Sequence, residues 1–265
     1  MIIEFIGTPG AGKTTLLPVV IDYFDGLGFR TYTVVQAARP FAERTLLGKA
    51  ISRLAPAGLR QPLLWQVFYH LSKLYRLKFI TKNWELIRSV LRYQKTRPIS
   101  GQDREHVLTW FIHLVGYYEF LSSRLEPNEA LILDEGFIHR VVQLFASEVE
   151  EPDPDHISAY INLLPKPDLV VFPSAPKEMC EKRVYARGVW ERFRLKSPAE
   201  ISRYIANSHE VVNLAVDCIK NKGWVVLDVD NGDEDPAKAK AELHRELSSS
   251  FTYSFRLPEL HSHVQ

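Results

Sequence analysis

Short apolar runs along the chain alternate with longer stretches in which apolar residues recur at about every third or fourth position. The apolar runs are residues 2–6, 30–36, 130–133, 169–172 and 225–229. Runs of this length predict buried strands, and the longer periodicity predicts helices. Their alternation predicts an α/β fold of three layers, in which helices cover both faces of a parallel sheet of about five strands.

The stretch between the second and third runs is too long for a simple connection and predicts a helical insertion over residues 48–125. Helical periodicity covers Leu63–Thr81, Trp84–Gln94 and Val107–Leu125. From Lys49 to Arg104 the chain has twelve Lys and Arg residues against two acidic ones, although the whole chain carries a net charge of only +1. We therefore expect the insertion to face something anionic. The alternative is that its aromatic residues are core and its charges a solvated outer face.

Composition bounds the class of protein. A chain of 265 residues with 46% apolar residues can bury a large core. Two cysteines, Cys180 and Cys218, form no metal-like cluster or disulfide framework, and no signal peptide or membrane-spanning run is visible. We expect a cytoplasmic protein with one domain over residues 1–247, followed by a tail over 248–265.

A phosphate-binding loop follows the first predicted strand. It consists of Gly7, Thr8, Pro9, Gly10, Ala11, Gly12, Lys13, Thr14 and Thr15, which is a complete G-x-x-x-x-G-K-T pattern. Glycines let the backbone N–H groups approach phosphates, Lys13 places a charge on the β and γ oxygens, and the Thr14 hydroxyl is a Mg²⁺ ligand. The helix that begins at Thr14 points its N-terminal dipole at the same anion. This order of strand, loop and helix predicts a P-loop NTPase fold.

The third predicted strand ends in two carboxylates, Asp134 and Glu135. In a P-loop protein, a carboxylate at this strand end holds Mg²⁺, and a second one polarises an attacking hydroxyl or water. We assign Asp134 a metal or base role and Glu135 a base role, with a simple capping role for Glu135 as the alternative.

An arginine-rich segment follows the fourth predicted strand. Arg183 and Arg187 lie four residues apart on one face of a predicted helix that ends at Gly188, and Arg192 follows on a segment expected to be mobile. Mobile arginines supply positive charge to a phosphoryl group in its transition state. The alternative is a solvated basic helix face.

Three segments carry a family resemblance: the strand Pro167-Asp168-Leu169, the pattern Arg183-x-x-x-Arg187-Gly188, and Glu191-Arg192-Phe193. Together they resemble the closing half of thymidylate kinases, and the resemblance covers residues 1–47 and 126–247. It implies a kinase core with ATP and Mg²⁺ as phosphoryl donor, and Lys13, Arg187 and Arg192 around the transferred group. It also implies that the segment containing Asn231 wraps the adenine.

The departures from this family lie on the acceptor side. Thymidylate kinases have R-E-P after the second strand, where this chain has Ala38-Arg39-Pro40, and Glu135 replaces an arginine of their D-R-Y segment. His139 and Arg140 are candidates to compensate, with surface roles as the alternative. The acceptor is therefore not expected to be thymidylate.

Three functions remain open. The first is a small-molecule kinase whose basic insertion lines the acceptor site and favours an anionic acceptor. The second is a nucleoside monophosphate kinase with altered acceptor residues. The third is an ATP-hydrolysing switch that binds nucleic acid or an anionic membrane through residues 49–104. An N-K-x-D guanine motif is absent from the sequence, which counts against a GTPase.

Overall fold

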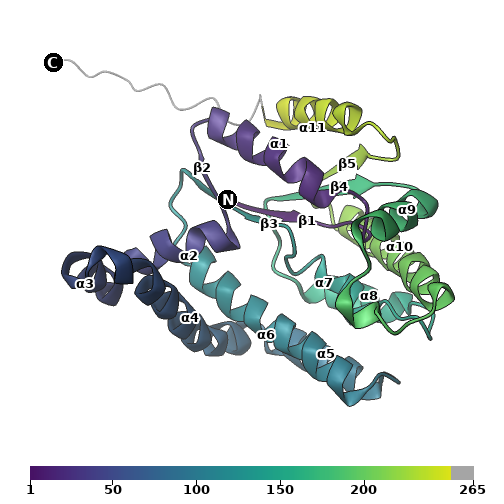
Figure 1. Ribbon diagram of the computed structural model, residues 1–265, viewed down its shortest axis with the longest axis horizontal. Helices are drawn as coiled ribbons and strands as arrows, with labels where there is room; N and C mark the ends of the chain where they lie inside the picture. Colours follow the sequence, from purple (N-terminus) through teal and green to yellow (C-terminus); the bar gives the residue numbers. More distant parts are fainter. Residues whose placement is uncertain (252–265) are drawn as a thin grey trace.

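The structure, a computed structural model, describes residues 1–251 apart from the side chain of Arg192. Five parallel strands form one sheet in the order β2-β3-β1-β4-β5 (Figure 1). Their bounds are β1 Ile2–Phe5, β2 Arg30–Thr33, β3 Glu129–Leu133, β4 Leu169–Ser174 and β5 Val226–Asp230. The predicted three-layer α/β fold is confirmed. Because β3 lies directly beside β1, the loops that follow these two strands emerge next to each other.

Alternate residues of each strand pack against different helices. Ile3 and Phe5 contact α1 (Lys13–Gly26) and α11 (Pro236–Phe251), which cover one face of the sheet (Figure 1). Leu131 and Leu133 belong to the larger core on the other face. The helices of that second layer include α6 (Gly101–Ser122), α7 (Arg140–Phe145), α8 (Pro154–Leu163), α9 (Lys177–Arg187) and α10 (Pro198–Asn221).

The strand predicted over residues 30–36 is wrong in its second half. β2 ends at Thr33, and α2 (Val34–Glu43) begins at once. The Thr33 hydroxyl accepts a hydrogen bond from the Gln36 amide at 3.4 Å, and the Gln36 side chain accepts one from the Thr33 amide at 2.9 Å. This reciprocal cap satisfies N–H groups of the first helical turn, and it overrides the strand preference of Val34 and Val35.

The insertion is helical, as predicted, and contains one helix that periodicity did not reveal. It consists of α3 (Leu46–Leu54), α4 (Ala57–Lys82), α5 (Trp84–Thr96) and α6. α4 packs closely on α6, because a Cβ at Gly116 of α6 would overlap the Ser72 carbonyl of α4. α6 in turn contributes Phe111, Val115 and Leu121 to the core beneath the sheet. α3, α4 and α5 therefore lie outermost, on the side away from α1 and α11 (Figure 1).

At the C-terminus, α11 continues to Phe251, so the first residues of the predicted tail are helical. The remainder of that tail, residues 252–265, lies outside the described residues. Among the helices of the described residues, none is both long enough and apolar enough to cross a membrane.

Candidate active site

The loop between β1 and α1 depends on glycine at two positions. Gly10 has φ 89° and Gly12 has φ 95°, a region that side chains with a Cβ rarely enter. A Cβ at Gly10 would also overlap the Cys180 carbonyl of α9, and a Cβ at Gly12 would overlap the Asn231 amide. The loop is therefore held in a shape that only these glycines permit, with α9 and the end of β5 packed against it.

Lys13 lies at the N-terminus of α1, and its Nζ donates a hydrogen bond to the Gly7 carbonyl at 2.9 Å. Burial lowers the pKa of Lys13 to about 8; Arg187 lowers it further, while Glu135 and Asp134 oppose the change. Glu135 and Asp134 therefore offset only part of the effect of desolvation on this partly buried ammonium. A polyphosphate in the loop would supply a further anionic partner.

Asp134 and Glu135 follow β3 directly and are both exposed. The Glu135 amide donates to Asp134 Oδ1 at 3.1 Å, and Glu135 Oε2 lies 3.5 Å from Arg140 Nη1. Both carboxylates act on the pKa of Lys13, so the two predicted motifs meet at one edge of the sheet. The two acids differ in their surroundings, because within the described residues Arg140 forms an ion pair with Glu135 and acts on Asp134 only from a greater distance.

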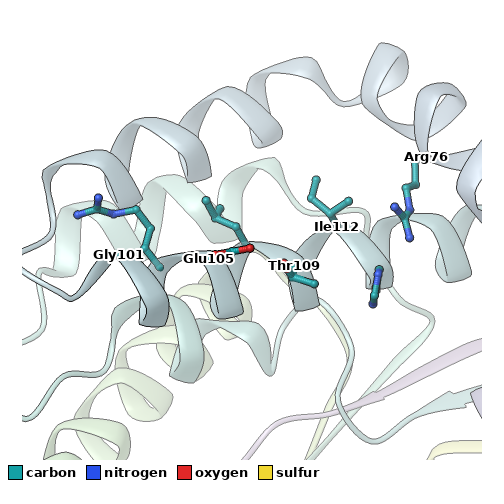
Figure 2. Close-up of a pocket in the computed structure, with 8 residues that line it drawn as sticks. Arg76, Gly101, Glu105, Thr109 and Ile112 are labelled. Atoms are coloured by element: carbon teal, nitrogen blue, oxygen red, sulfur yellow. The ribbon is translucent and has the colours of Figure 1, made fainter.

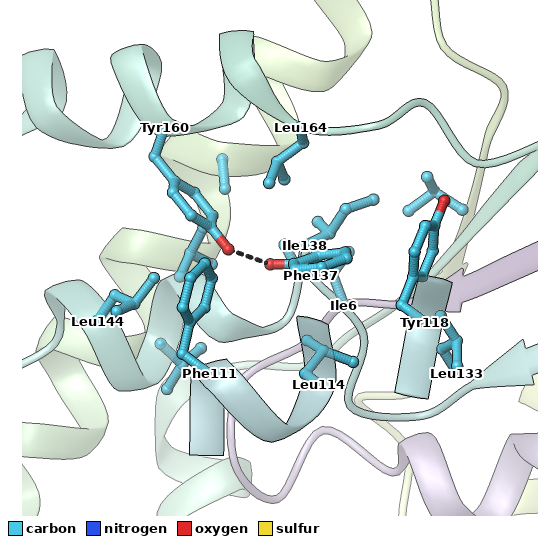
Figure 3. Packing of buried hydrophobic residues seen from close by; sticks show 14 of the residues in the cluster. Ile6, Phe111, Leu114, Tyr118, Leu133, Phe137, Ile138, Leu144, Tyr160 and Leu164 are labelled. Atoms are coloured by element: carbon cyan, nitrogen blue, oxygen red, sulfur yellow. Dashed lines mark hydrogen bonds between the residues drawn. The ribbon is translucent and has the colours of Figure 1, made fainter. Parts of the chain in front are cut away.

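The segment after these acids is fixed by aromatic packing. The Phe137 ring stacks on Phe79 with centroids 5.1 Å apart and meets Tyr118 edge-on at 4.9 Å. The Tyr160 hydroxyl donates to the Phe137 carbonyl at 2.9 Å, with Phe111 beside it (Figure 3). Helices α4, α6 and α8 therefore all position the turn that carries Asp134 and Glu135.

Glu4 of β1 lies beneath the same segment and is fully buried. Its Oε2 accepts a hydrogen bond from the Ile138 amide at 2.8 Å, whereas Oε1 has no partner among the described residues. Burial raises the pKa of Glu4 to about 7, with the Ile138 hydrogen bond and Arg140 acting in the opposite direction. Glu4 therefore keeps its proton to a higher pH than an ordinary glutamate, and it holds the segment after β3 in place through the Ile138 amide.

His139 and Arg140 are both buried, so a surface role for either is excluded. His139 lines the cavity; burial holds its pKa well below the usual value, and Lys13 and Arg140 add to the effect. Arg140 stands behind Glu135 and beneath Trp110, with its guanidinium 5.5 Å from the Trp110 ring centroid. It also bonds to Gln143.

The arginines of the predicted lid occupy different surroundings. Arg183 donates to the carbonyls of Asn231 at 2.9 Å and Asp233 at 2.6 Å. Arg187 is exposed, lies 5.2 Å from the centre of the Trp190 ring, and faces the cavity. Arg183 therefore ties α9 to the loop after β5, whereas Arg187 is free of such bonds within the described residues.

The segment after α9 is packed rather than extended into solvent. Trp190 meets Tyr204 of α10 edge-on with ring centroids 6.2 Å apart, and Phe193 packs at a tilt against the same ring at 4.7 Å. Arg192 lies between them in a short 3-10 helix, Glu191–Phe193, and its side chain is outside the described part of the structure. A capping box formed by Ser197 and Glu200 begins α10.

Asn231 is buried against the phosphate loop. Its Nδ2 donates to the Ala11 carbonyl at 2.7 Å, and its backbone amide donates to the Ser174 carbonyl at 2.7 Å. It does not line the cavity, and neither do Gly7, Thr8 and Ala11. These four residues therefore lie on the side of the loop that faces away from the cavity. The adenine contact implied for Asn231 stays a prediction.

One cavity of about 1170 Å³ is lined by the other predicted site residues whose side chains the structure describes. From the phosphate loop it is lined by Pro9, Gly10, Gly12, Lys13, Thr14 and Thr15, and from the other motifs by Asp134, Glu135, Arg183 and Arg187. The wall opposite the loop belongs to the insertion. There α6 and the residues before it contribute Arg97, Ile99, Gln102, Asp103, His106, Val107 and Trp110.

This insertion wall differs from the expectation of a basic acceptor site. Of the twelve cationic residues between Lys49 and Arg104, only Arg97 lines the cavity. Its guanidinium is already bonded to the carbonyls of Leu144 at 2.7 Å and Ala146 at 3.0 Å. The wall therefore offers an aromatic ring and polar side chains rather than free positive charge. Sequence reasoning missed it, because Gln102, His106 and Trp110 form one face of an insertion helix with no motif.

A second pocket, of about 470 Å³, lies on a different face of α6. It runs along Gly101, Glu105, Thr109 and Ile112 and ends at Arg76 of α4 (Figure 2). It shares no lining residue with the main cavity. The phosphate-loop residues that line a pocket therefore line the larger cavity and not this one.

No protein-family model matches the chain, and no curated protein does. Among solved structures, the chain is similar to deoxyadenosine kinase from M. mycoides with the products dCMP and a flexible dCDP bound, at 15% identity and a TM-score of 0.41, covering 94% of this chain and 100% of that one. It is also similar to TT1252 from Thermus thermophilus, at 14% identity and a TM-score of 0.41, covering 95% of this chain and 97% of that one. Likenesses this distant do not indicate function.

Proposed function

We propose that this protein is an ATP-dependent phosphotransferase that acts on a hydroxyl group of a small molecule. The observation that carries the proposal is the shared cavity, in which Lys13, the two carboxylates after β3 and Arg187 face a separate wall formed by α6. A nucleotide hydrolase has no need of such a second wall, whereas a kinase must hold an acceptor opposite the γ-phosphoryl group.

The loop residues fit a nucleotide triphosphate. The positive-φ glycines turn backbone N–H groups inward, and Lys13 lacks an anionic partner strong enough to restore its pKa. Thr14 and Asp134 offer the oxygen ligands that Mg²⁺ prefers, and Mg²⁺ takes its remaining ligands from phosphates and water. Bound Mg-ATP would supply the phosphoryl group and neutralise part of its charge.

Glu135 is the residue that we assign to the acceptor proton. Its carboxylate would accept the proton of the attacking hydroxyl as the new O–P bond forms and the bond to ADP breaks. Arg140 lies 3.5 Å away and has few other positions open to it, because it is buried beneath Trp110. Arg140 thus acts as a positioning residue that aims Glu135 into the cavity.

Arg187 is the lid residue that we assign to the transition state. It faces the cavity and makes no hydrogen bond to the protein within the described residues, so its guanidinium is available to the transferring group. Arg183 already holds three carbonyl oxygens, including that of Gly10 at 3.4 Å. We therefore give Arg183 the task of holding α9 against the loop, while Arg187 stabilises developing charge.

The acceptor is proposed to be uncharged. Trp110 offers a flat apolar surface, while Gln102, Asp103 and His106 offer hydrogen-bonding groups. The cations that would recognise a phosphorylated acceptor lie elsewhere on the insertion. This distribution supports a small polar acceptor with a flat face, and it counts against the nucleoside monophosphate kinase alternative.

The test is ADP release from Mg-ATP in the presence of nucleosides, sugars, sugar phosphates, nucleoside monophosphates and lipid-linked alcohols. We expect one uncharged class to stimulate release, and Lys13→Ala to abolish it. Lys240→Ala, which changes an exposed lysine of α11 outside the cavity, is the matched control. ADP release that is equal with every acceptor and with none would reject the kinase and favour an ATP-hydrolysing switch.

A further inference from the structure

Large apolar side chains are exposed mainly on one part of this molecule. Of the eighteen large apolar residues that are exposed among the described residues, ten lie between Leu46 and Leu91, on α3, α4 and α5. They are Leu46, Leu47, Leu54, Leu59, Leu63, Trp65, Leu74, Leu77, Trp84 and Leu91. Single exposed leucines need no explanation, but a concentration of this kind marks an interaction surface.

The exposed leucines of α4 form a stripe. Leu59, Leu63, Leu74 and Leu77 are spaced by four, eleven and three residues, which places them within an arc of about 60° on a helix. The opposite side of α4 is also apolar, because Leu64, Phe68 and Phe79 are buried against the core there. An ordinary surface helix is polar on its outer face. Gln66 and His70 are exposed between the two leucine pairs, so the outer face of α4 presents two apolar patches to solvent where an ordinary surface helix is polar.

Cations flank this stripe on the neighbouring helices. α3 has Lys49 and Arg53 among its exposed leucines, and neither makes an ion pair within the described residues. α5 presents Trp84, Arg88, Leu91 and Lys95 at spacings of four, three and four residues, again one helical face. From Leu46 to Lys95 the sequence has ten basic residues and one acidic residue, Glu85. Of these basic residues, Lys78 and Lys82 pair with Glu119 of α6, and Arg76 lines the pocket along α6. The outer face thus joins apolar contact with the positive charge of the remaining cations, among them Lys49, Arg53, Arg92 and Lys95.

We propose that the outer face of α3, α4 and α5 docks on the surface of an anionic lipid bilayer. Leucine and tryptophan side chains would enter the headgroup region, and lysine and arginine side chains would lie on lipid phosphates. This is the chemistry of a helix that lies in the membrane interface without crossing it. The proposal is independent of phosphotransfer, because none of these exposed leucines and tryptophans lines the nucleotide cavity.

Two other partners fit the surface less well. A nucleic acid would pair with the cations but would leave the leucine stripe of α4 in water. A second copy of the chain, related by a two-fold axis, would bring the exposed cations of α3 and α5, among them Lys49, Arg53, Arg92 and Lys95, against those of its partner. An anionic bilayer satisfies the charge and the apolar area together.

Flotation with lipid vesicles tests the proposal on the full chain. We expect the protein to float with vesicles of phosphatidylcholine and phosphatidylglycerol, and not with phosphatidylcholine alone. The double variant Leu74→Glu/Leu77→Glu should weaken binding by more than about tenfold, because both leucines are more than half exposed and form part of the docking face. Leu27→Glu, at an exposed leucine after α1, is the matched control and should bind like the wild type.

The electrostatic part is tested by Lys49→Glu/Arg53→Glu, which should also lose binding while keeping the leucine stripe. The variant Lys13→Ala should float normally, which separates this proposal from the proposed phosphotransfer. Equal flotation of wild type and Leu74→Glu/Leu77→Glu would overturn the proposal. Two further outcomes would overturn it if the wild type does not bind vesicles. One is a wild-type dimer that Leu74→Glu/Leu77→Glu dissociates, and the other is retention of the wild type on single-stranded DNA.

Discussion

The two walls of the large cavity are made from different parts of the chain. The phosphate-loop wall presents backbone N–H groups and the cationic side chain of Lys13, all from one short segment held from behind by Asn231 and Arg183. The insertion wall presents side chains of α6, among them His106 and Trp110, and has no such backbone cradle. The first wall suits a ligand that is the same in many proteins, and the second suits one particular molecule.

Because the two walls differ in this way, substitutions in one should have different effects from substitutions in the other. Changes in the loop should disturb its shape and the proposed binding together, because we propose that the backbone N–H groups themselves bind the phosphates. Changes on the insertion wall should disturb only the second ligand, because each side chain acts alone. The following predictions test this separation, beginning with the largest effect.

Arg187→Ala should lower kcat by about a hundredfold to a thousandfold, as expected for a group that acts on developing charge. The KM for ATP should change little, because Arg187 makes no ground-state contact with the loop within the described residues. Steady-state kinetics with varied ATP measures both constants. Arg194→Ala, at an exposed lid arginine that does not line the cavity, should retain activity. If kcat/KM fell because the KM for ATP rose while kcat stayed constant, Arg187 would have no role in the transition state.

Gly12→Ala should lower the free energy of unfolding by about 3 kcal/mol and abolish ATP binding. The added Cβ meets both a φ of 95° and the Asn231 side chain, so the bond from Asn231 to Ala11 must break. Urea unfolding and nucleotide titration check the two effects. Gly26→Ala, where the new Cβ meets nothing within 4 Å, is the matched control and should be at least as stable as the wild type, because alanine is the better helix former. Unchanged ATP binding in Gly12→Ala would show that the loop is less constrained than the structure indicates.

Glu4→Gln should change how stability depends on pH, because Glu4 is buried and bonded to the segment that follows Asp134 and Glu135. Its pKa rises from 4.5 in the unfolded chain to about 7 in the folded protein, mainly through burial. The folded state therefore binds this proton more tightly, and the associated stability is complete below pH 4.5 and is lost as pH rises to about 7. Relative to Glu4→Gln, the wild type should lose at most about 3 kcal/mol across that window.

Urea unfolding at a series of pH values measures this difference. The exposed Glu178→Gln should follow the wild-type curve at every pH. If the curves of Glu4→Gln and wild type ran parallel, Glu4 would ionise in the folded protein as it does in the unfolded chain.

Trp110→Ala should raise the KM for the acceptor by about tenfold, the loss of one aromatic contact, and leave the KM for ATP unchanged. The ring lines the insertion wall and lies over Arg140, so its removal opens the acceptor side alone. Kinetics with varied acceptor and fixed ATP test the change. Trp84→Ala removes an exposed tryptophan outside the cavity and should leave both KM values as in the wild type. A change in the KM for ATP instead would show that the insertion wall also contributes to the nucleotide site.

Sequence patterns predicted the sheet, the phosphate loop and the acids after β3, because each depends on local spacing. Lys13, Asp134 and Arg187 could be assigned to one site from the sequence alone, since the carboxyl ends of parallel strands meet at one edge. The start of α2 was missed because the Thr33 cap competes with an apolar run that favours a strand. The insertion wall was also missed, because which face of α6 meets the cavity is decided by packing of α4 and α7 on α6.

The position of Asn231 in the chain determines when, during synthesis, the phosphate loop can reach its final structure. The Asn231 side chain, 220 positions along the chain from Ala11, holds the phosphate loop from behind. A nascent chain on the ribosome contains every residue of that loop long before Asn231 is added, and it lacks the bond from Asn231 to Ala11 until β5 has emerged and paired with β4. A chain that stops before β5 therefore has the loop sequence without the side chain that holds the loop in place, and we expect it to lack the proposed nucleotide binding.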